Sequence, residues 1–227
     1  MSSSLIYCIR DYINESNTTS RDFIAVTTKI MRGRGRPRRF DPEEGVAIAQ
    51  RMFLARGYDA VGVADLTEAL GINPPSFYAA YGSKSELFKR ALNRYSETDG
   101  VPLMAILKPG RPVAEALSEV LKDAAKKYTA NSGSGGCLAI EGTKCNDIDA
   151  RSAALTLTSA ARDTICRFIA ATHPDVAELT ADYMVAVMSG LSALAREGYG
   201  SNRVIQIAEL ASTALIGKLK DQHGENF

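Results

Sequence analysis

Five arginines stand within eight residues, from Arg32 to Arg39, and no acidic residue lies among them. A guanidinium group stays charged at every physiological pH and binds phosphate through paired hydrogen bonds. Because glycine and proline interrupt this stretch, we expect a flexible or extended basic arm over residues 32–40 rather than a helix. Such an arm could lie along DNA, where arginine suits a narrow minor groove. The alternative is a solvated tail that only aids solubility.

Enzyme signatures are missing from the sequence. It has no His-Glu-x-x-His, no Gly-x-Ser-x-Gly and no Walker loop, and its two histidines are His173 and His223. We therefore predict a protein that is not an enzyme and that uses no metal and no cofactor. The four cysteines contain no Cys-x-x-Cys pair, which argues against a disulfide framework or a zinc ribbon. Three of them stay open as redox sensors: Cys137, Cys145 and Cys166.

Composition and charge point to a globular protein with two unlike parts. The chain has 227 residues, of which 45% are hydrophobic and 23% charged, and no apolar run approaches the ~20 residues that span a bilayer. We expect a cytoplasmic protein without a membrane partner. The net charge of +1 is unevenly spread: we count 11 basic and 7 acidic residues over 32–95, against 13 and 16 over 96–227. A basic part and an acidic part predict a nucleic-acid surface on the first.

The first 31 residues are predicted to be a disordered extension. They are rich in serine, threonine and asparagine and carry no helical stripe. Met31 immediately precedes the basic arm, and we take as a hypothesis that it is the native start of the protein.

Four short helices are predicted between residues 41 and 98. Three of them, the first, third and fourth, begin at a capping residue or a proline, and glycine closes the first two. The expected spans run from Asp41 to Gly57, from Val63 to Leu70, from Pro74 to Tyr81 with Asn73 as its cap, and from Ser83 to Tyr95. Two short helices joined by a turn match the helix-turn-helix, whose second helix enters the major groove. Such pairs also occur in helical proteins without a DNA role, but the arginine arm favours DNA.

These residues carry a resemblance to a known family. The order and spacing over residues 36–95 resemble the N-terminal domain of the TetR/AcrR regulators, one-component bacterial transcription factors. The matching motifs are Arg36-Pro37-Arg38, Phe40-Asp41, Gly57-Tyr58, Gly71-Ile72, Ser76-Phe77-Tyr78, Tyr81-Gly82-Ser83-Lys84 and Leu87-Phe88. Gly136-Cys137-Leu138 and Gly190-Leu191 with Ala195-Arg196 also recur in one branch of that family. Arg34-Gly35-Arg36-Pro37 further resembles the core of an AT-hook, a minor-groove motif.

The resemblance implies a DNA-binding surface. The helix over 74–81 would be the recognition helix, Tyr81 would meet the DNA backbone, and Lys84 would hold a phosphate at the start of the next helix. With the arm, the expected DNA-binding residues are Arg34, Arg36, Arg38, Arg39, Pro74, Pro75, Ser76, Tyr78, Ala79, Tyr81 and Lys84. One position departs from the family: Val61-Gly62 stands where a capping threonine or serine usually touches a phosphate.

Residues 99–227 are predicted to form a helical domain for ligand binding and dimerisation. Val113, Leu117, Leu121, Ala124 and Tyr128 make one stripe, and a long helix carrying Ile148, Leu155, Arg162, Ile165 and Phe168 ends at His173-Pro174. Helices over about 176–196 and 203–218 are apolar around much of their girth and carry small residues, so we expect them to form a homodimer. The alternative is that they pack within one subunit. Candidate ligand-binding residues are Tyr128, Cys137, Phe168, Tyr183, Met184 and Met188.

The sequence thus predicts an all-α protein with an N-terminal helix-turn-helix domain and a C-terminal helical domain. Its expected partners are a palindromic double-stranded operator, an unidentified small-molecule effector and a second copy of the chain. The function that follows is a transcriptional repressor that the effector releases from DNA. Two alternatives stay open: an architectural protein that binds A·T tracts through its arm, and a regulator that senses redox state through its cysteines.

Overall fold

Side-chain caps set the ends of the first helices in the computed structural model, which describes residues 41–130, 133 and 135–220. These helices are α1 (Pro42–Arg56), α2 (Val63–Leu70), α3 (Pro74–Tyr81) and α4 (Lys84–Thr98). Asp41 accepts a hydrogen bond from the Glu43 amide at 2.9 Å, and Asn73 accepts one from the Ser76 amide at 2.9 Å. The predicted spans of α1, α2 and α3 are confirmed, whereas α4 runs three residues beyond its predicted end at Tyr95. The extension, Met31 and the arm with Arg34, Arg36, Arg38 and Arg39 lie outside the described residues.

The start of α2 explains how the family's hydroxyl cap can be absent. Gly62 has no side chain to accept a bond, but the Asp65 carboxylate accepts from the Gly62 amide at 2.7 Å. Arg56, at the end of α1, donates to the same carboxylate at 3.2 Å. A carboxylate in the first turn also suits the positive end of the helix dipole. The turn is therefore held by an acid three residues beyond the usual cap.

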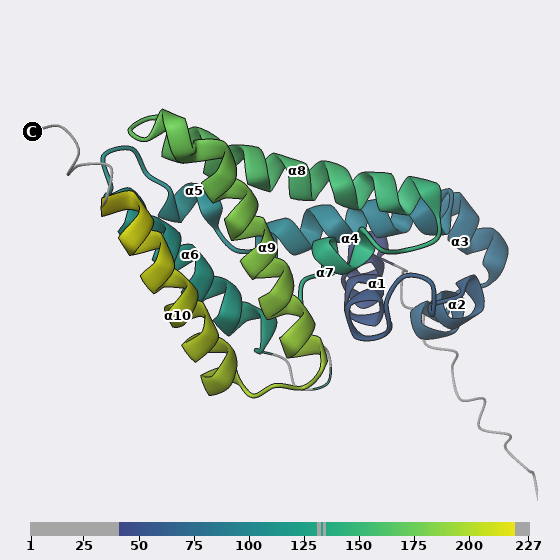
Figure 1. The fold of residues 1–227 in the computed structure, drawn as a ribbon. Helices are drawn as coiled ribbons and strands as arrows, with labels where there is room; N and C mark the ends of the chain where they lie inside the picture. Colours follow the sequence, from purple (N-terminus) through teal and green to yellow (C-terminus); the bar gives the residue numbers. More distant parts are fainter. Residues whose placement is uncertain (1–40, 131–132, 134, 221–227) are drawn as a thin grey trace, which may run out of the picture. The chain divides into compact units, whose positions relative to one another are not determined.

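The remaining elements form a helical body. They are α5 (Leu103–Ile106), α6 (Val113–Tyr128), α7 (Leu138–Gly142), α8 (Ile148–Ala170), the 3-10 turn η1 (Pro174–Val176), α9 (Ala177–Arg196) and α10 (Ser201–Lys220). The predicted stripe of α6 is confirmed, because all five of its residues are buried. α6 packs against α9 and α10, while α8 lies along α4 and α9 (Figure 1). No helix among the described residues is long and apolar enough to cross a membrane.

Two details of the body differ from the sequence prediction. α5 and α7 were not predicted, because helices of four and five residues are too short to display a helical period. On α8 the expected stripe is wrong at its start: Ile148 is 71% exposed and Leu155 is 48% exposed. The helix instead buries the small residues Ala150 and Ala154. Alanine lets α8 lie close to its neighbours, and the larger side chains turn outward.

An apolar face of α9 and α10 points away from the rest of the chain. Leu179 is 68% exposed and Leu210 is 73% exposed, although both are leucines on long helices. A side chain added at Gly190 would meet no atom within 4 Å. Exposed large apolar residues beside small ones are typical of a surface that another chain covers. We call the exposed residues Leu179, Tyr183, Ala186, Gly190, Leu210 and Ala214 the outer face.

Candidate functional site

The outward side of α3 is the most exposed part of the helix-turn-helix. Pro74, Pro75, Ser76, Tyr78 and Ala79 are all exposed, and the Tyr78 side chain is 52% exposed. Gly71 permits the tight turn before this helix, since its φ of 65° lies in the left-handed region. The five predicted residues therefore share one face, free to meet the edges of DNA bases.

Tyr81 lies on the opposite side of α3, so the geometry gives no support to the prediction that it meets the DNA backbone. Its side chain is only 4% exposed, and its hydroxyl donates to the Pro42 carbonyl at 3.0 Å. The hydroxyl fits there because Gly45 of α1 has no side chain: an added Cβ would lie 2.0 Å from that oxygen. Burial of Tyr81 raises the pKa of its phenol, which stays protonated. Tyr81 fixes α3 on α1.

Lys84 is also turned inward. Its ammonium donates to the carbonyls of Tyr58 and Val61 at 3.1 and 3.0 Å, and it lies 3.9 Å from the centre of the Tyr58 ring. These contacts tie the start of α4 to the loop between α1 and α2. The structure therefore gives Lys84 a positioning role that the sequence did not reveal, and its predicted phosphate contact has no support from this geometry.

A second tie joins the same loop to the helical body. The Tyr58 hydroxyl donates to the Asp147 carboxylate at 2.8 Å, and the backbone amide of Asn146 donates to Asp59 at 3.0 Å. Burial raises the pKa of the Tyr58 phenol, and the neighbouring Asp147 carboxylate raises it further. The pKa of Asp147 is lowered, first by the Ala150 amide and then by Tyr58. The loop that supports the helix-turn-helix is thus bonded to the start of α8.

A cavity of about 720 Å³ opens within the body. Its walls come from the end of α4, from α5 and from the middle of α8, with contributions from α6, α7 and α9. Three predicted ligand-binding residues line it: Tyr128, Cys137 and Met188. Pockets of about 300–1,000 Å³ with mostly apolar walls hold small molecules and cofactors in other proteins.

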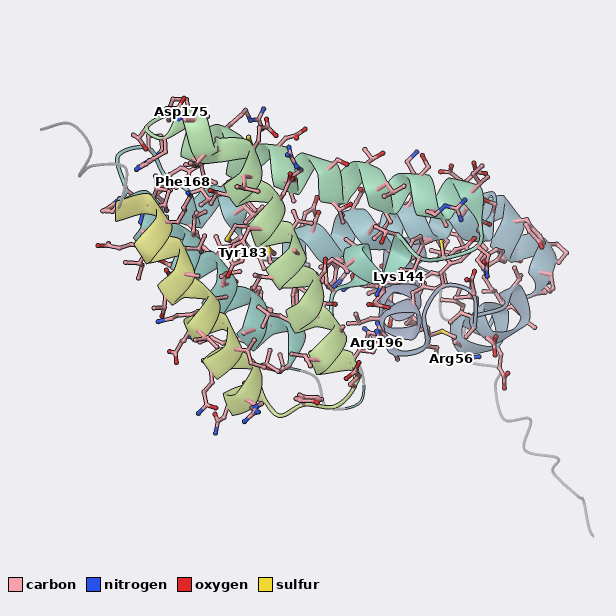
Figure 2. The ribbon with its side chains drawn as sticks, in the orientation of Figure 1. Arg56, Lys144, Phe168, Asp175, Tyr183 and Arg196 are labelled. Carbon is pink, nitrogen blue, oxygen red and sulfur yellow. The ribbon has the colours of Figure 1, made fainter. Side chains whose placement is uncertain are left out.

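The other three predicted ligand-binding residues do not line this cavity. Met184 is fully buried in the core, and Phe168 packs against that core near the far end of α8. Tyr183 belongs to the outer face, and its hydroxyl donates to the Ala211 carbonyl of α10 at 3.3 Å (Figure 2). A helical stripe identifies buried residues but cannot tell a cavity wall from solid core.

Two buried tyrosines and a cysteine meet at one end of the cavity. Tyr95, Tyr128 and Cys137 all line the wall, and Cys137 lies close enough to both phenols to raise their pKa. Burial raises the pKa of both phenols well above the ordinary value of about 10. Both therefore remain protonated donors. The sequence identified Tyr95 only as an anchor of its helix, because its place beside Cys137 depends on tertiary packing.

The environments of Cys145 and Cys166 do not favour redox chemistry. Burial is the main cause that raises the pKa of the Cys145 and Cys166 thiols, so the reactive thiolate is less populated. His173 hydrogen-bonds to the Thr172 hydroxyl. Among the described residues, no group of three or more histidine, cysteine or acidic side chains could hold a metal ion.

Arg196 connects three elements at the end of α9. Its guanidinium donates to the Leu54 carbonyl of α1 at 3.1 Å and lies 3.3 Å from the Glu141 carboxylate of α7. Nearby, the Ser192 hydroxyl accepts a bond from the Cys137 amide at 2.9 Å. Figure 2 shows Arg196 at the end of α9 that faces α1. The cavity wall, the outer-face helix and the first helix therefore meet here, a role that the sequence did not identify.

Comparisons with known proteins agree with this arrangement. A family model described as "Bacterial regulatory proteins, tetR family" matches residues 46–91. The chain is 48% identical over 190 residues to the HTH-type transcriptional repressor BdcR of Escherichia coli K12, covering 84% of this chain and 96% of that protein. It is 29% identical to the HTH-type transcriptional repressor ComR of the same organism, covering 80% and 92%.

A solved structure has a similar fold and is bound to DNA. The TetR family regulator CifR, a cysteine-substituted variant in complex with a 26 bp double-strand operator, superposes with a TM-score of 0.67. The two sequences are 31% identical, and the match covers 79% of this chain and 99% of that one. SCO4454 of Streptomyces coelicolor, at 16% identity and a TM-score of 0.65, shows the likeness of fold alone.

Proposed function

The chain belongs to the TetR family of bacterial regulatory proteins, and from that premise we propose that it represses transcription until a small molecule releases it from its operator. Like its relatives, it is a DNA-binding transcriptional regulator and not an enzyme. The observation that carries the proposal is the exposed face of α3, held by Tyr81 on one side and open on the other. We infer a cytoplasmic location, because its target is DNA.

The proposed DNA surface is the face of Pro74, Pro75, Ser76, Tyr78 and Ala79, together with the arginine arm. This face carries no arginine, lysine, asparagine or glutamine, which are the side chains that read bases through paired hydrogen bonds. Sequence readout would then come from apolar contacts, from the Tyr78 hydroxyl and from DNA shape. The arm would add affinity that depends on salt.

The protein acts as a homodimer in this proposal, and the outer face is the surface on which the two copies meet. Leucines exposed by 68% and 73% support this assignment, because such residues gain most from burial. A two-fold axis there would present two recognition helices about one DNA turn (~34 Å) apart.

Release by a small molecule follows from the position of α4. The helix begins at Lys84, separated from α3 by Gly82 and Ser83 alone, and its last turns supply Tyr95 and Ser96 to the cavity wall. A molecule in the cavity can therefore change the tilt of α4 and with it the distance between the recognition helices. The protein would exist in two states, one that binds the operator and one that does not. A ligand shifts the equilibrium between them only as far as it binds one state more tightly than the other.

Footprinting on the DNA upstream of the gene that encodes this protein tests the proposal. With excess nonspecific competitor DNA, we expect a short symmetric footprint that survives. A footprint without symmetry that follows A·T tracts would support the architectural alternative instead. If binding disappears with competitor across the neighbouring promoters, the proposed sequence-specific repressor is wrong.

A further inference from the structure

The cavity wall carries almost no charge. Of its residues in the described part of the chain, Arg162 alone is charged, and the rest are apolar or neutral polar. An anionic ligand in such a place needs a cation as partner, because an unpaired buried carboxylate costs several kcal/mol. Whether Arg162 can serve therefore decides the charge of the ligand.

The guanidinium of Arg162 is already occupied. Its Nε donates to Asp182 at 2.7 Å, its Nη2 donates to Glu178, and its Nη1 lies 3.6 Å from Asp163. Three carboxylates surround one cation, so the local charge is negative. A carboxylate or phosphate ligand would have to displace these acids and meet their repulsion. Glu178 and Asp182 come from α9, across from Arg162 on α8.

At the uncharged end of the cavity, two hydroxyl donors lie near a weak hydrogen-bond acceptor. The protonated hydroxyls of Tyr95 and Tyr128 share this part of the wall with the Cys137 sulfur, which is a weak acceptor. A ligand oxygen would be a stronger acceptor at the same place. Apolar side chains such as Val101, Leu103 and Ile140 line other parts of the wall.

We propose that the cavity takes an uncharged, mainly apolar molecule with one oxygen acceptor, such as a ketone, seated on the hydroxyls of Tyr95 and Tyr128. Carboxylates of the same size are rejected, because Glu178 and Asp182 neutralise Arg162. This inference rests on the proposed function only in taking the cavity as the effector site. Arg162, Glu178 and Asp182 set the specificity without touching the favoured ligand.

Calorimetric titration of the free protein tests the ligand class without involving DNA. The probes are 2-nonanone and nonanoate at pH 7.5, which have the same number of carbons and differ in charge. We expect the ketone to bind at least tenfold more tightly than the carboxylate. Equal binding, tighter carboxylate binding, or no binding of the ketone would overturn the proposal.

Two sets of variants test the residues. Tyr95→Phe with Tyr128→Phe removes both hydroxyls and keeps the rings, and should weaken ketone binding about fivefold to tenfold. Glu178→Gln with Asp182→Asn frees Arg162, and should strengthen nonanoate binding at least fivefold. If the first pair binds the ketone as tightly as the natural protein, the assigned seat is wrong; if the second pair gains nothing for nonanoate, the assigned selectivity is wrong.

Failure here can be separated from failure of the repressor proposal. A protein that gives a symmetric footprint but does not bind 2-nonanone contradicts the ligand class alone. A protein that binds 2-nonanone but gives no footprint contradicts the repressor proposal alone. Circular dichroism melting of each variant confirms that it folds.

Discussion

The first four helices and the helical body are built on different principles. α1 to α4 are short, and capping bonds such as Asp41 to Glu43 and Asn73 to Ser76 fix their ends. α6, α8, α9 and α10 are long and are held by packing against one another, and the first three of them contribute to the wall of a cavity. Local capping bonds hold α1 to α4 in one conformation, whereas a helical body that contains a cavity can adopt more than one. The contrast assigns reading DNA to the first and responding to a ligand to the second.

Breaking the outer face should have the largest effect, and it would act on the DNA-binding region from a distance. Leu210→Glu puts a charge where the second copy is expected to pack, which costs several kcal/mol in a buried interface. We expect a monomer with operator affinity lowered at least about 100-fold. Analytical ultracentrifugation and fluorescence anisotropy measure the two quantities. Ile148→Glu, at an equally exposed residue on α8, is the control, and a dimeric Leu210→Glu protein would contradict the assignment.

Removing the connection at Arg196 should come next. Arg196→Ala loses the bond to Leu54 and the ion pair with Glu141, so we expect the free energy of unfolding to fall by about 1–3 kcal/mol. Arg196→Lys should recover only part of this, since an ammonium cannot reproduce the guanidinium fork. Urea unfolding checks both, with the exposed Arg203→Ala as control. An unchanged unfolding free energy would mean that the contacts of Arg196 do not stabilise the fold.

Tyr78→Ala sharpens the comparison from the DNA side. The residue is exposed on α3, so its loss should leave folding and dimerisation unchanged while weakening operator binding about tenfold, which is about 1.4 kcal/mol. Anisotropy titration with the operator measures the loss. Tyr199→Ala removes a similarly exposed tyrosine between α9 and α10 and should bind as the natural protein does. Equal affinities for the two variants would show that α3 does not face the DNA.

Lys84→Met distinguishes a positioning role from a phosphate contact. The change removes the bonds to Tyr58 and Val61, and we expect unfolding to be easier by about 1 kcal/mol and operator affinity to fall severalfold. The dependence of affinity on salt should not change. If the slope of the logarithm of affinity against the logarithm of salt concentration fell in magnitude by about one unit, Lys84 would instead be identified as a phosphate contact. Lys89→Met, an exposed lysine of the same helix, is the matched control.

The smallest effect should be a pH dependence at the tie between the regions. The pKa of Asp147 is lowered by the Ala150 amide and the Tyr58 hydroxyl, so its charged form stabilises the fold. This contribution to stability is complete at pH values above the ordinary carboxyl pKa of about 4. It is lost as the pH falls through the lowered pKa of the folded protein. Asp147→Asn should therefore be less stable at pH 7 and approach the natural protein near pH 2. Urea unfolding at several pH values, with Asp149→Asn as control, measures this; a difference that grows in acid would refute it.

The same contrast governs how far the sequence predicts the structure. The boundaries of α1, α2 and α3 are readable because Asp41, Gly71 and Asn73 act within a few residues of themselves. The stripe of α6 is readable because a helix packed along its length repeats every three or four residues. The family resemblance supplied the identity of the recognition helix, which periodicity alone does not contain.

The candidate sites depend on contacts between distant residues, and there the sequence fell short. The family resemblance predicted Tyr81 as a DNA contact and the start of a helix predicted Lys84 as one. Their bonds to Pro42 and Tyr58 depend on tertiary structure, so the sequence did not reveal them. Phe168 and Met184 looked like cavity residues because apolar types line both cavities and cores. Arg196 was marked only as part of a family motif, and its structural role was not readable because its partner Leu54 lies 142 positions away.

The missing side chain at Gly45 has a consequence for genetic screens. Because an added methyl group would collide with the Tyr81 hydroxyl, any replacement there moves the recognition helix on α1. A reporter assay would score such a mutant as defective in operator recognition, although the residue lies beneath α3 rather than on its exposed side. Pairing the replacement with Tyr81→Phe would give partial suppression, so second-site revertants would reveal the packing that loss of repression alone conceals.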